Sequence, residues 1–350
     1  MKKIFLLWPW NVWKKFIEKV LKKHSENIQI VWIANSKDYI FNKKWLDIKI
    51  LEEIISWGQK QILEKFSQHQ NLKEIIKISE NSSDKIFFVD LTSWKEILLN
   101  FHKSIIQNKK HKIITANKNP ISIYWINDFE NLNSKYYESN TTVMAGWWVV
   151  DFVQSRKKIK DEIFSIQGCF SGTLWYILSE LEQWKKTFSE IVRTAKEEWY
   201  TEPNPWDDLN WLDVARKILI LARYCWERIS MKDVEIEPLI LEKFWNFSWE
   251  EFLQKISEAD QFFENLRKTA EWKNKVLRYV WEYSKKDWKK IIKVWLKSFD
   301  KNSEFWQLNW TANIAIIETE TLLNPIPHVI KSRGAWIEVT AESVISGILK

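Results

Sequence analysis

The segment from residue 195 to 217 concentrates charged side chains of the kind that line a polar active site. Glu202 precedes Pro-Asn-Pro, which predicts an extended loop because residues before proline avoid the helical region. Asp208 can cap the helix that follows, and Asp213 and Lys217 are spaced i, i+4, so that their side chains share one helical face. Charged side chains gathered beside such a loop are typical of a polar active site. A capped helix with a surface ion pair is the alternative interpretation.

A second candidate site lies where the first predicted strand meets the first predicted helix, at Trp8-Pro9-Trp10-Asn11-Val12-Trp13. With glycine in place of each tryptophan this sequence is G-P-G-N-V-G, the dinucleotide-binding fingerprint in its expected position. Those glycines make the tight turn, let the backbone approach the pyrophosphate and permit close packing of helix on strand, while the helix N-terminus receives the phosphate charge. Indole rings would fill this space. An aromatic cluster at the junction is the alternative interpretation.

The composition favours glycine at these positions. The chain has 25 Trp and only 6 Gly, whereas glycine ordinarily makes up about 7% of a protein and serves turns and caps. The simplest explanation is that UGA codons, read as glycine in the source organism, have been translated as tryptophan. Other tryptophans also stand where glycine is expected, at helix ends, at a predicted hairpin and beside Gly146: Trp184, Trp226, Trp281, Trp288, Trp147 and Trp148. The sequence leaves open which of the tryptophans are genuine.

Apolar runs and helical periods alternate along the first part of the chain. Strands of the buried type are predicted at 3–8, 28–34, 85–91 and 112–116, and helices at 11–21 and 95–106. Strands that alternate with helices predict βαβ units and a parallel sheet. We therefore expect a Rossmann-type dinucleotide-binding domain at 1–138.

The pattern changes near residue 140. A strand is predicted at 162–170, two antiparallel strands at 275–283 and 289–298, and helices at 171–183, 187–198, 210–228 and 249–268. We expect an α+β substrate-binding and dimerisation domain at 139–324. The segment from about 325 to 350, with a helix near 339–349, is expected to pack back on the first domain. The predicted fold class is thus α/β, with an additional α+β domain.

The composition also excludes several classes of protein. Hydrophobic residues make up 45% and charged residues 28% of the chain, which indicates a globular rather than a disordered or fibrous protein. No apolar run approaches the roughly 18 residues of a membrane span, so no membrane partner is expected. The net charge of +7 comes mostly from dispersed lysines, which argues against a nucleic-acid partner. The two cysteines form no metal or disulfide pattern, which favours a cytoplasmic location.

Residues 195–217 resemble the homoserine dehydrogenase signature along its whole length, and the glycines of that signature fall on Trp199 and Trp211. Four further stretches resemble the family's T-A-N-K segment, its V-G-A-G turn, its N-G-T-x-N-Y-I-L stretch and its closing G-A-G-x-x-x-T-A: Ile114–Lys118, Val143–Gly146, Gly168–Leu178 and Arg333–Ala341. The resemblance extends from residue 3 to about 349. It is strongest to the dehydrogenase half of bifunctional aspartokinase–homoserine dehydrogenases.

The resemblance implies roles for the candidate catalytic residues. Lys217 and Lys118 would be the amines near the substrate hydroxyl, and Lys217 would be the general acid/base. Asp213 would hold Lys217.

It also implies a set of substrate-binding residues. Glu202 and Asp208 would bind the amino group of homoserine. Tyr200, Gly172 and Thr173 would line the pocket. For Thr173, a helix cap at the end of the preceding strand is an equally good interpretation.

The end of the second strand bears on the choice of cofactor. An NAD site usually carries Asp or Glu there for the ribose hydroxyls. This chain has Asn35-Ser36-Lys37, with no acid before Asp38 and a cation for a 2′-phosphate, so NADP is favoured over NAD. The other expected cofactor-binding residues, with the tryptophans taken as glycines, are Trp8, Trp10, Asn11, Val12, Trp13, Thr92, Ser93, Lys118 and Gly334. Capping of the next helix by Thr92 or Ser93 is compatible with this placement.

Two motifs depart from the family pattern. Members often bind a monovalent cation through a loop with an acidic residue shortly before V-G-A-G, where this chain has Asn140, with Glu138 two residues earlier. A cation site therefore stays open, with the backbone near Val143 and Ala145 as candidate ligands. Met144 and Ser332 also replace glycines of the family motifs, and neither change removes a proposed catalytic group.

These features predict an NADP-dependent homoserine dehydrogenase, which reduces L-aspartate 4-semialdehyde to L-homoserine on the branch to threonine and methionine. The resemblance also implies a homodimer built around 140–155 and strands near 311–320. Another two-domain amino-acid dehydrogenase is an alternative. A protein that stacks bases or sugars on true tryptophans would need them on one exposed face, whereas here they fall mainly at predicted turns and helix ends. A chain that truly carries Trp8, Trp10 and Trp13 should be an inactive homologue that does not bind the dinucleotide.

Overall fold

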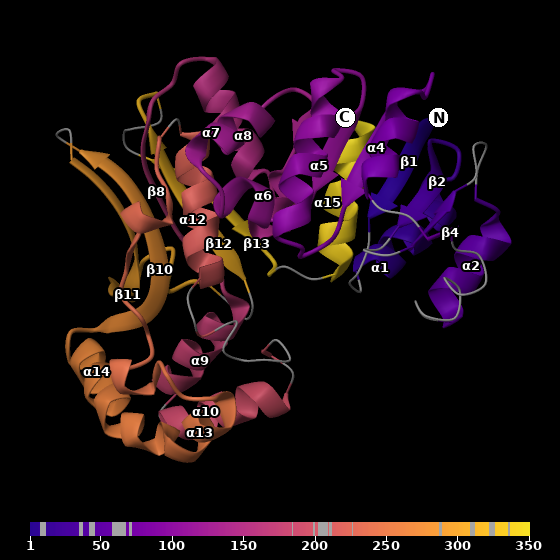
Figure 1. The fold of residues 1–350 in the computed structure, drawn as a ribbon. Coiled ribbons are helices and arrows are strands. Elements are labelled where there is room, and N and C mark those ends of the chain that lie inside the picture. The colour runs from indigo at the N-terminus through magenta and orange to yellow at the C-terminus, as the bar shows by residue number, and fades with distance from the viewer. Residues whose placement is uncertain are drawn as a thin grey trace. The chain divides into compact units, whose positions relative to one another are not determined.

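A computed structural model divides the chain into two compact units, Met1–Val150 with Ala335–Lys350, and Asp151–Gly334 (Figure 1). The first unit extends beyond the predicted boundary at 138 because the turns of Asn140–Gly146 pack against the C-terminal helix. The structure describes residues 1–7, 12–34, 38–41, 46–57, 68–69, 72–183, 185–198, 200–201, 209, 212–225, 227–286, 289–308, 312–321, 326–334 and 337–350.

The sheet of the first unit is parallel over five strands. These are β2 (Ile28–Ala34), β1 (Lys2–Leu7), β5 (Ile86–Asp90), β6 (Lys112–Thr115) and β7 (Tyr137–Glu138), in that spatial order. The short strands β3 (Asp38–Phe41) and β4 (Gln68–His69) extend the β2 edge in antiparallel fashion. The predicted Rossmann-type α/β class is confirmed. The antiparallel edge was not expected from the sequence.

Helices connect and cover these strands. They are α1 (Val12–Lys19) with a following π-helical turn η1 (Val20–His24), α2 (Ile48–Trp57), α4 (Leu72–Glu80), α5 (Glu96–Gln107), α6 (Asn119–Ser122), α7 (Ile126–Leu132) and α15 (Ile337–Leu349). The 3₁₀ turns η2 (Asn140–Thr142) and η3 (Met144–Gly146) follow β7, shortly before the first segment of this unit ends at Val150.

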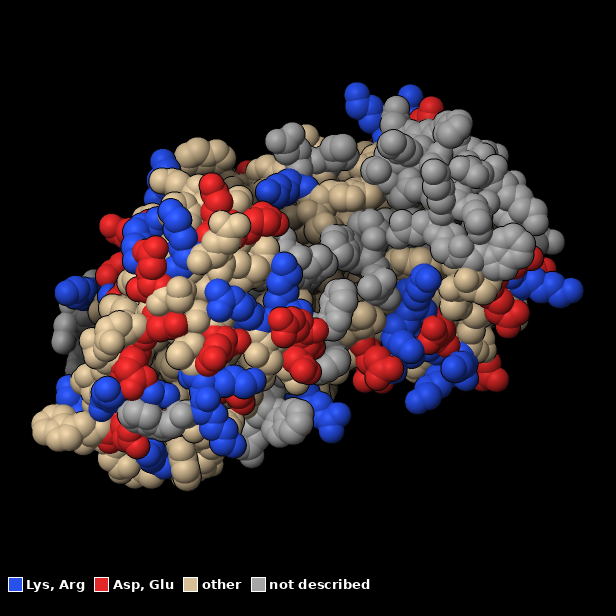
Figure 2. All heavy atoms as spheres, turned by 90° about the horizontal axis from the view of Figure 1, so that it is seen from below, with Lys and Arg blue, Asp and Glu red and all other residues tan. Residues whose placement is uncertain are grey.

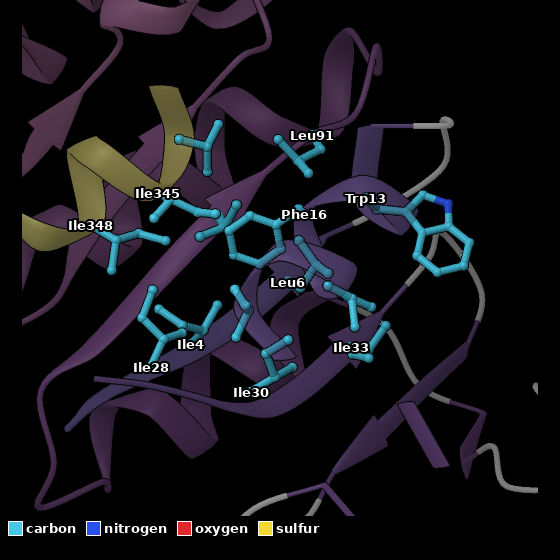
Figure 3. Close-up of a cluster of buried hydrophobic side chains, with 14 of the residues drawn as sticks. Ile4, Leu6, Trp13, Phe16, Ile28, Ile30, Ile33, Leu91, Ile345 and Ile348 are labelled. Carbon is cyan, nitrogen blue, oxygen red and sulfur yellow. The ribbon is translucent and has the colours of Figure 1, made fainter. Parts of the chain in front are cut away.

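The hydrophobic core of the first unit joins both ends of the chain. Ile4 of β1 and Phe16 of α1 belong to the same buried cluster as Ile345 and Ile348 of α15 (Figure 3). Burial of each such side chain contributes roughly 1.5–3 kcal/mol, so these contacts hold the last helix to this unit. In the structure, α15 therefore belongs to the core of the first unit.

The second unit contains a mixed six-stranded sheet. Its spatial order is β13 (His328–Ser332), β12 (Asn313–Thr319), β8 (Ile163–Cys169), β10 (Lys275–Lys286), β11 (Lys289–Asp300) and β9 (Glu235–Ile236). All neighbours are antiparallel except β9 and β11. The expectation that the whole segment from about 325 packs on the first domain is wrong for residues 328–332, because β13 pairs with β12 in this sheet.

Helices also pack in the second unit. They are α8 (Val149–Lys158), which belongs to this unit from Asp151 on, α9 (Gly172–Glu182), α10 (Phe188–Glu197), α12 (Leu212–Tyr224), α13 (Trp249–Lys255) and α14 (Asp260–Trp272), with 3₁₀ turns η4 (Met231–Asp233), η5 (Glu242–Phe244) and η6 (Ile256–Ala259). The single helix predicted at 249–268 is wrong, because η6 interrupts it. Directly after η6, the carboxylate of Asp260 accepts hydrogen bonds from the backbone N–H (2.7 Å) and hydroxyl (2.8 Å) of Ser189.

The described surface carries charges of both signs. In Figure 2, lysine and arginine side chains are interspersed with aspartate and glutamate over the described part of the face shown. Among the described helices, none is both long and apolar enough to cross a membrane.

Candidate active site

Lys217 is held on α12 by two oxygen atoms. Its Nζ lies 2.7 Å from Oδ2 of Asp213 and donates a 2.9 Å hydrogen bond to the carbonyl oxygen of Phe170, directly after β8. The Lys217 side chain is 11% exposed, whereas that of Asp213 is 42% exposed. The i, i+4 spacing thus produces the expected pair. The pair of Lys217 and Asp213 is not an exposed surface ion pair, because the ammonium is mostly buried and also hydrogen-bonds to a backbone carbonyl.

The turn between β8 and α9 lies beside this lysine, and it carries the candidate pocket residues. Ser171 caps α9 by accepting a 3.3 Å hydrogen bond from the N–H of Leu174, and Gly172 is the first helical residue. The alternative that Thr173 caps this helix is therefore wrong. The buried hydroxyl of Thr173 instead donates a 2.8 Å hydrogen bond to the carbonyl of Tyr200.

Tyr200 is fixed from two sides. Besides accepting from Thr173, it stacks its ring on Tyr176 of α9, with ring centroids 4.3 Å apart and an interplanar angle of 21°. Burial, helped by Glu180 and by Tyr200 itself, raises the pKa of Tyr176, so its phenol stays neutral. The sequence motif contained Tyr176, but the resemblance gave it no role. Its signal is the spacing from Thr173, one helical turn away on α9.

The acidic part of the proposed substrate site is outside the described residues. Glu202 and Asp208 both fall there, and so do the signature positions Trp199 and Trp211. Leu209, which follows Asp208, is buried. The roles of the two acidic residues therefore stay predictions.

The first unit brings other candidates together at the carboxyl ends of β5 and β6, where dinucleotide-binding sheets place their ligands. Thr92 is buried, and its hydroxyl accepts hydrogen bonds from the side-chain amide of Asn117 (3.2 Å) and the N–H of Trp94 (3.4 Å). Ser93 is exposed. Neither residue caps α5, whose N-cap is Lys95 without a side-chain cap, so the capping interpretation is wrong.

Lys118 lies in the neighbouring loop, at the N-cap of α6. Its carbonyl accepts a 2.7 Å hydrogen bond from the hydroxyl of Ser122. The residues on either side of Lys118 both hydrogen-bond to the loop after β5: Asn117 to Thr92, and Asn119 to the carbonyl of Ser93 at 2.8 Å. Lys118 is therefore carried by a turn that hydrogen bonds tie to the loop after β5.

The fingerprint region is described only in part. Residues 8–11 and 35–37 lie outside the described residues, which leaves Trp8, Trp10, Asn11, Asn35, Ser36 and Lys37 as predictions. Val12 is the first described residue of α1. Trp13 follows it and is 1% exposed, at one end of the hydrophobic cluster in Figure 3. Gly334 is buried after β13, in the second unit.

The turn at Val143–Gly146 has an unusual backbone. Met144, Ala145 and Gly146 have φ of 52°, 51° and 87°, a region that favours glycine. A Cβ atom at Gly146 would lie 2.5 Å from the Cβ of Ser343, so this position needs glycine for space as well. The carbonyl of Val143 accepts the N–H of Gly146 within the turn. Within the described residues there is no group of three or more side chains suited to a metal ion, and the cation site stays a prediction.

Some tryptophans have a backbone or an environment that is unfavourable for an indole side chain. Trp148 has φ of 55°. Among described residues, several buried indole N–H groups have no hydrogen-bond acceptor: those of Trp147, Trp175, Trp281 and Trp295. A buried donor without an acceptor costs about 1–3 kcal/mol. The expectation that Trp281 marks a hairpin end is wrong, because it lies inside β10.

Comparison with known proteins points to one family. The family model described as homoserine dehydrogenase matches residues 149–349. A chloroplastic bifunctional aspartokinase/homoserine dehydrogenase of Daucus carota is 32% identical over 342 residues, covering 95% of this chain and 35% of the carrot protein. The homoserine dehydrogenase of Saccharomyces cerevisiae is 33% identical, covering 80% of this chain and 79% of the yeast protein. This chain thus spans about a third of the bifunctional relatives and most of the yeast enzyme.

A solved structure agrees with this likeness at the level of the fold. A hyperthermophilic archaeal homoserine dehydrogenase in complex with NADPH has a TM-score of 0.73 and 20% sequence identity, covering 100% of this chain and 97% of the archaeal chain.

Proposed function

Because the chain belongs to the homoserine dehydrogenase family, we propose that it reduces L-aspartate 4-semialdehyde to L-homoserine with NADPH and catalyses the reverse oxidation. The observation that carries the proposal is the fixed ammonium of Lys217, held between Asp213 and the carbonyl of Phe170 beside the turn with Gly172 and Thr173. An oxidoreductase acting on a CH–OH group needs such a group, because the alcohol oxygen must lose or gain a proton in each turnover.

The chain's own part in this reaction is proton transfer and orientation. NADPH supplies two electrons and a hydrogen to the aldehyde carbon when bound. Lys217, directly or through water, gives a proton to the aldehyde oxygen, which becomes the hydroxyl of homoserine. Asp213 keeps the ammonium in place, and Lys118 is proposed as a second cation near the same oxygen. Glu202 and Asp208 are proposed to bind the amino group of the substrate, in a pocket lined by Tyr200, Gly172 and Thr173.

The described part of the first unit fits a dinucleotide. The adjacent parallel strands β1, β5 and β6 end at one edge of the sheet, and α1 begins shortly after β1, which are the elements that bind a dinucleotide in such sheets. We propose that Ser93 and Lys118 contact the cofactor there, with Thr92 shaping the loop. Gly334, Val12 and the fingerprint positions complete the proposed set. Lys37, with no acid before Asp38, supports NADP over NAD.

We propose a homodimer formed through the sheet of the second unit. Alternate residues of a strand point to opposite faces, and on β12 Ile317 is fully buried while Ile316 stays partly exposed. Ile316 is one of several partly buried apolar side chains that pack against the same buried cluster, among them Trp295, Phe299 and Val329. An apolar sheet face with residual exposure suits a second copy of the chain. Residues 140–155 are proposed to contribute to the same interface.

We propose a cytoplasmic location. Cys169 and Cys225 are both free. Burial raises the pKa of the Cys169 thiol to about 11 and that of Cys225 further still, so both thiols stay protonated and unreactive.

We also propose that many of the tryptophans are glycines in the protein that the gene encodes. The positive φ of Trp148 and the buried, unsatisfied indoles of Trp147 and Trp281 support this. The fingerprint and signature positions supply the independent sequence argument.

The activity is tested with protein made with glycine at the proposed recoded positions. Oxidation of NADPH is followed at saturating L-aspartate 4-semialdehyde, and reduction of NADP with homoserine. Malate, and aspartate semialdehyde supplied together with inorganic phosphate, serve as alternative substrates for the reduction of NADP. The proposal predicts turnover of the first pair alone. If the folded protein turns over another substrate but not homoserine, the chain is a different dehydrogenase and the proposal is wrong.

A further inference from the structure

A chain of buried polar side chains joins the ends of β5 and β6 and takes no part in the proton transfer proposed above. Asp90, the last residue of β5, is fully buried. Its Oδ1 accepts the N–H of Thr92 (2.9 Å), and its Oδ2 accepts the hydroxyl of Thr115 (3.0 Å), the last residue of β6. One carboxylate therefore binds the ends of two neighbouring strands.

A fully buried histidine extends this chain to the next elements. His102 of α5 places Nε2 3.3 Å from Oδ2 of Asp90, and its Nδ1 lies 3.1 Å from the hydroxyl of Tyr137 on β7. With Nδ1 accepting the Tyr137 hydroxyl, the ring proton stays on Nε2 and faces the Asp90 carboxylate. This approach is a close contact between the ring and the carboxylate, because Nε2 makes no hydrogen bond to any described residue. The carboxylate is thereby linked to α5 and to β7.

The same chain continues into the loops that carry Ser93 and Lys118. The hydroxyl of Thr115 accepts the N–H of Asn117 at 2.9 Å. The Asn117 side chain donates to Thr92 Oγ1 and to the carbonyl of Trp94 (3.0 Å), and it accepts the N–H of Asn119 at 2.9 Å. Loops 91–95 and 116–119 are thus cross-linked to each other and to Asp90.

Burial of this carboxylate is costly if its only task is to fill the core. Apolar side chains such as Phe88 and Phe101 fill the nearby interior, and replacing buried ionic groups by apolar ones is often neutral or stabilising. Asp90 accepts hydrogen bonds from Thr92 and Thr115, which lead into the two loops at the ligand-binding end of the sheet. This direction indicates that the network orders those loops.

A second buried histidine provides the contrast. His111 lies at the other end of β5, where Nδ1 accepts the N–H of Ile86 (3.1 Å) and Nε2 lies 2.9 Å from the carbonyl of Ser79. Burial lowers the pKa of His111, in keeping with this neutral, structural arrangement. The two residues are alike in type and burial and differ in which end of the strand they secure.

We propose that Asp90 and His102 are positioning residues for the dehydrogenase reaction: through Thr92, Thr115 and Asn117 they fix the loops that present Ser93 and Lys118 to the nicotinamide dinucleotide. This inference rests on the proposed function for its catalytic consequence. Its structural content, the ordering of two loops, is measurable without turnover.

The structural content is tested by hydrogen–deuterium exchange of the free full-length chain, comparing His102→Leu with His111→Leu. His102→Leu is expected to speed exchange by about tenfold or more in the 91–95 and 116–119 loops, since opening free energies fall when a network is broken. His111→Leu should instead speed exchange near Ser79 and Ile86. Unchanged exchange of the two loops in His102→Leu overturns the proposal, and this result does not depend on any enzyme activity.

The catalytic consequence is tested with Asp90→Asn, His102→Leu, His102→Gln and His111→Leu in the active protein. Misplacement of the loops is expected to raise the Kd for NADPH and to lower kcat in Asp90→Asn and in His102→Leu. In each variant the ratio of kcat to this Kd should fall by about 10- to 100-fold. His102→Gln, which keeps a side-chain donor, should recover part of the loss. His111→Leu should lower Tm but leave kcat and Kd near those of the parent. Equal kinetic losses in the two histidine variants would overturn the proposal, whereas a parent without homoserine turnover would count against the proposed function alone.

Discussion

At the residue scale, Lys217 offers the sharpest test of the proposed chemistry. Its ammonium is bound to Asp213 and to the carbonyl of Phe170, while α12 is anchored separately by buried apolar residues such as Ile218. Removing the ammonium therefore removes the proton donor and leaves the helix packed. We expect Lys217→Ala to lower kcat by about 10²- to 10⁴-fold, with little change in the Kd for NADPH. Steady-state kinetics and cofactor titration measure the two quantities.

The matched control is Lys268→Ala on α14. Lys268 also pairs with a carboxylate at i, i+4 spacing, with Nζ 3.3 Å from Oε1 of Glu264, but its side chain is 58% exposed. An exposed pair of this kind contributes little, so kcat should not change. Similar losses of kcat in both variants would mean that removing any paired lysine lowers activity, and that Lys217 is not the proton donor.

Tyr176 is the second residue with a testable role, because its ring supports Tyr200, which lies two residues before Glu202. Tyr176→Phe keeps the ring and should behave as the parent. Tyr176→Leu removes the stacking partner, and since an aromatic pair contributes about 0.5–1.5 kcal/mol, the KM for aspartate semialdehyde should rise by about 2- to 10-fold. A change in kcat alone, with the KM unaltered, would contradict this supporting role.

At the scale of elements, the sequence predicted those whose signal is local. Apolar runs gave β1, β2, β5, β6 and β8 to within a residue or two at each end, and helical spacing gave α5, α9 and α10. The spacing of Asp213 and Lys217 likewise gave their ion pair. Each of these features depends on residues close together in the chain.

Features that depend on distant partners were missed. The edge strands β3, β4 and β13 are short, and they are strands because of what they pair with. The break at η6 coincides with the Asp260–Ser189 contact between elements far apart in the sequence. The contact between Asp90 and His102 joins a strand to the next helix, and no spacing rule predicts it. The acid residues of the proposed substrate site still depend on the resemblance alone.

The link between β8 and β12 leads to a prediction about pH. Asp161, just before β8, accepts hydrogen bonds from the hydroxyl of Thr319 and the N–H of Thr321, both at 2.9 Å. Burial alone would raise the pKa of Asp161, but these hydrogen bonds and the charge of Arg156 outweigh it and hold the pKa below its ordinary value of 3.8. The stabilising effect is therefore present above the unfolded-state pKa and lost as the pH falls through the lower folded-state pKa.

Asp161→Asn should accordingly lower Tm more at pH 7 than at acid pH. The difference in Tm between parent and variant is expected to shrink as the pH falls below about 4, which thermal denaturation at a series of pH values measures. Glu258→Gln is the control, because its carboxylate lies on the surface in a 2.7 Å pair with Lys243 and should affect Tm little. A difference in Tm that grows on acidification would show that Asp161 is not stabilised as a carboxylate.

At the scale of the whole molecule, the proposed dimer places an apolar sheet face against a second copy. Ile316→Arg puts a charge on that face, where Ile316 pairs with Val329 of β13 and packs against the buried cluster of the sheet. A buried charge without a partner opposes association, so the mass in solution should shift from dimer to monomer. Ile48→Arg, at a residue of α2 that is 47% exposed, is the control and should not change the mass. Light scattering after size exclusion distinguishes these outcomes, and a monomeric parent would contradict the proposal.

The last prediction concerns whether the gene encodes tryptophan or glycine at positions 8, 10 and 13. The two possibilities predict opposite effects of a Trp→Gly exchange on stability and on NADPH binding. Trp13 is 1% exposed in the core of the first unit. If tryptophan is native there, exchange for glycine removes a large buried side chain and should cost about 3–5 kcal/mol. If glycine is native, a chain with glycine at positions 8, 10 and 13 should bind NADPH, while the tryptophan form should not, because indoles fill the space of the pyrophosphate. Thermal denaturation and NADPH titration of both forms measure this. The proposal predicts that the glycine form folds and binds; a glycine form that fails to fold, beside a tryptophan form that binds NADPH, would show that the tryptophans are genuine.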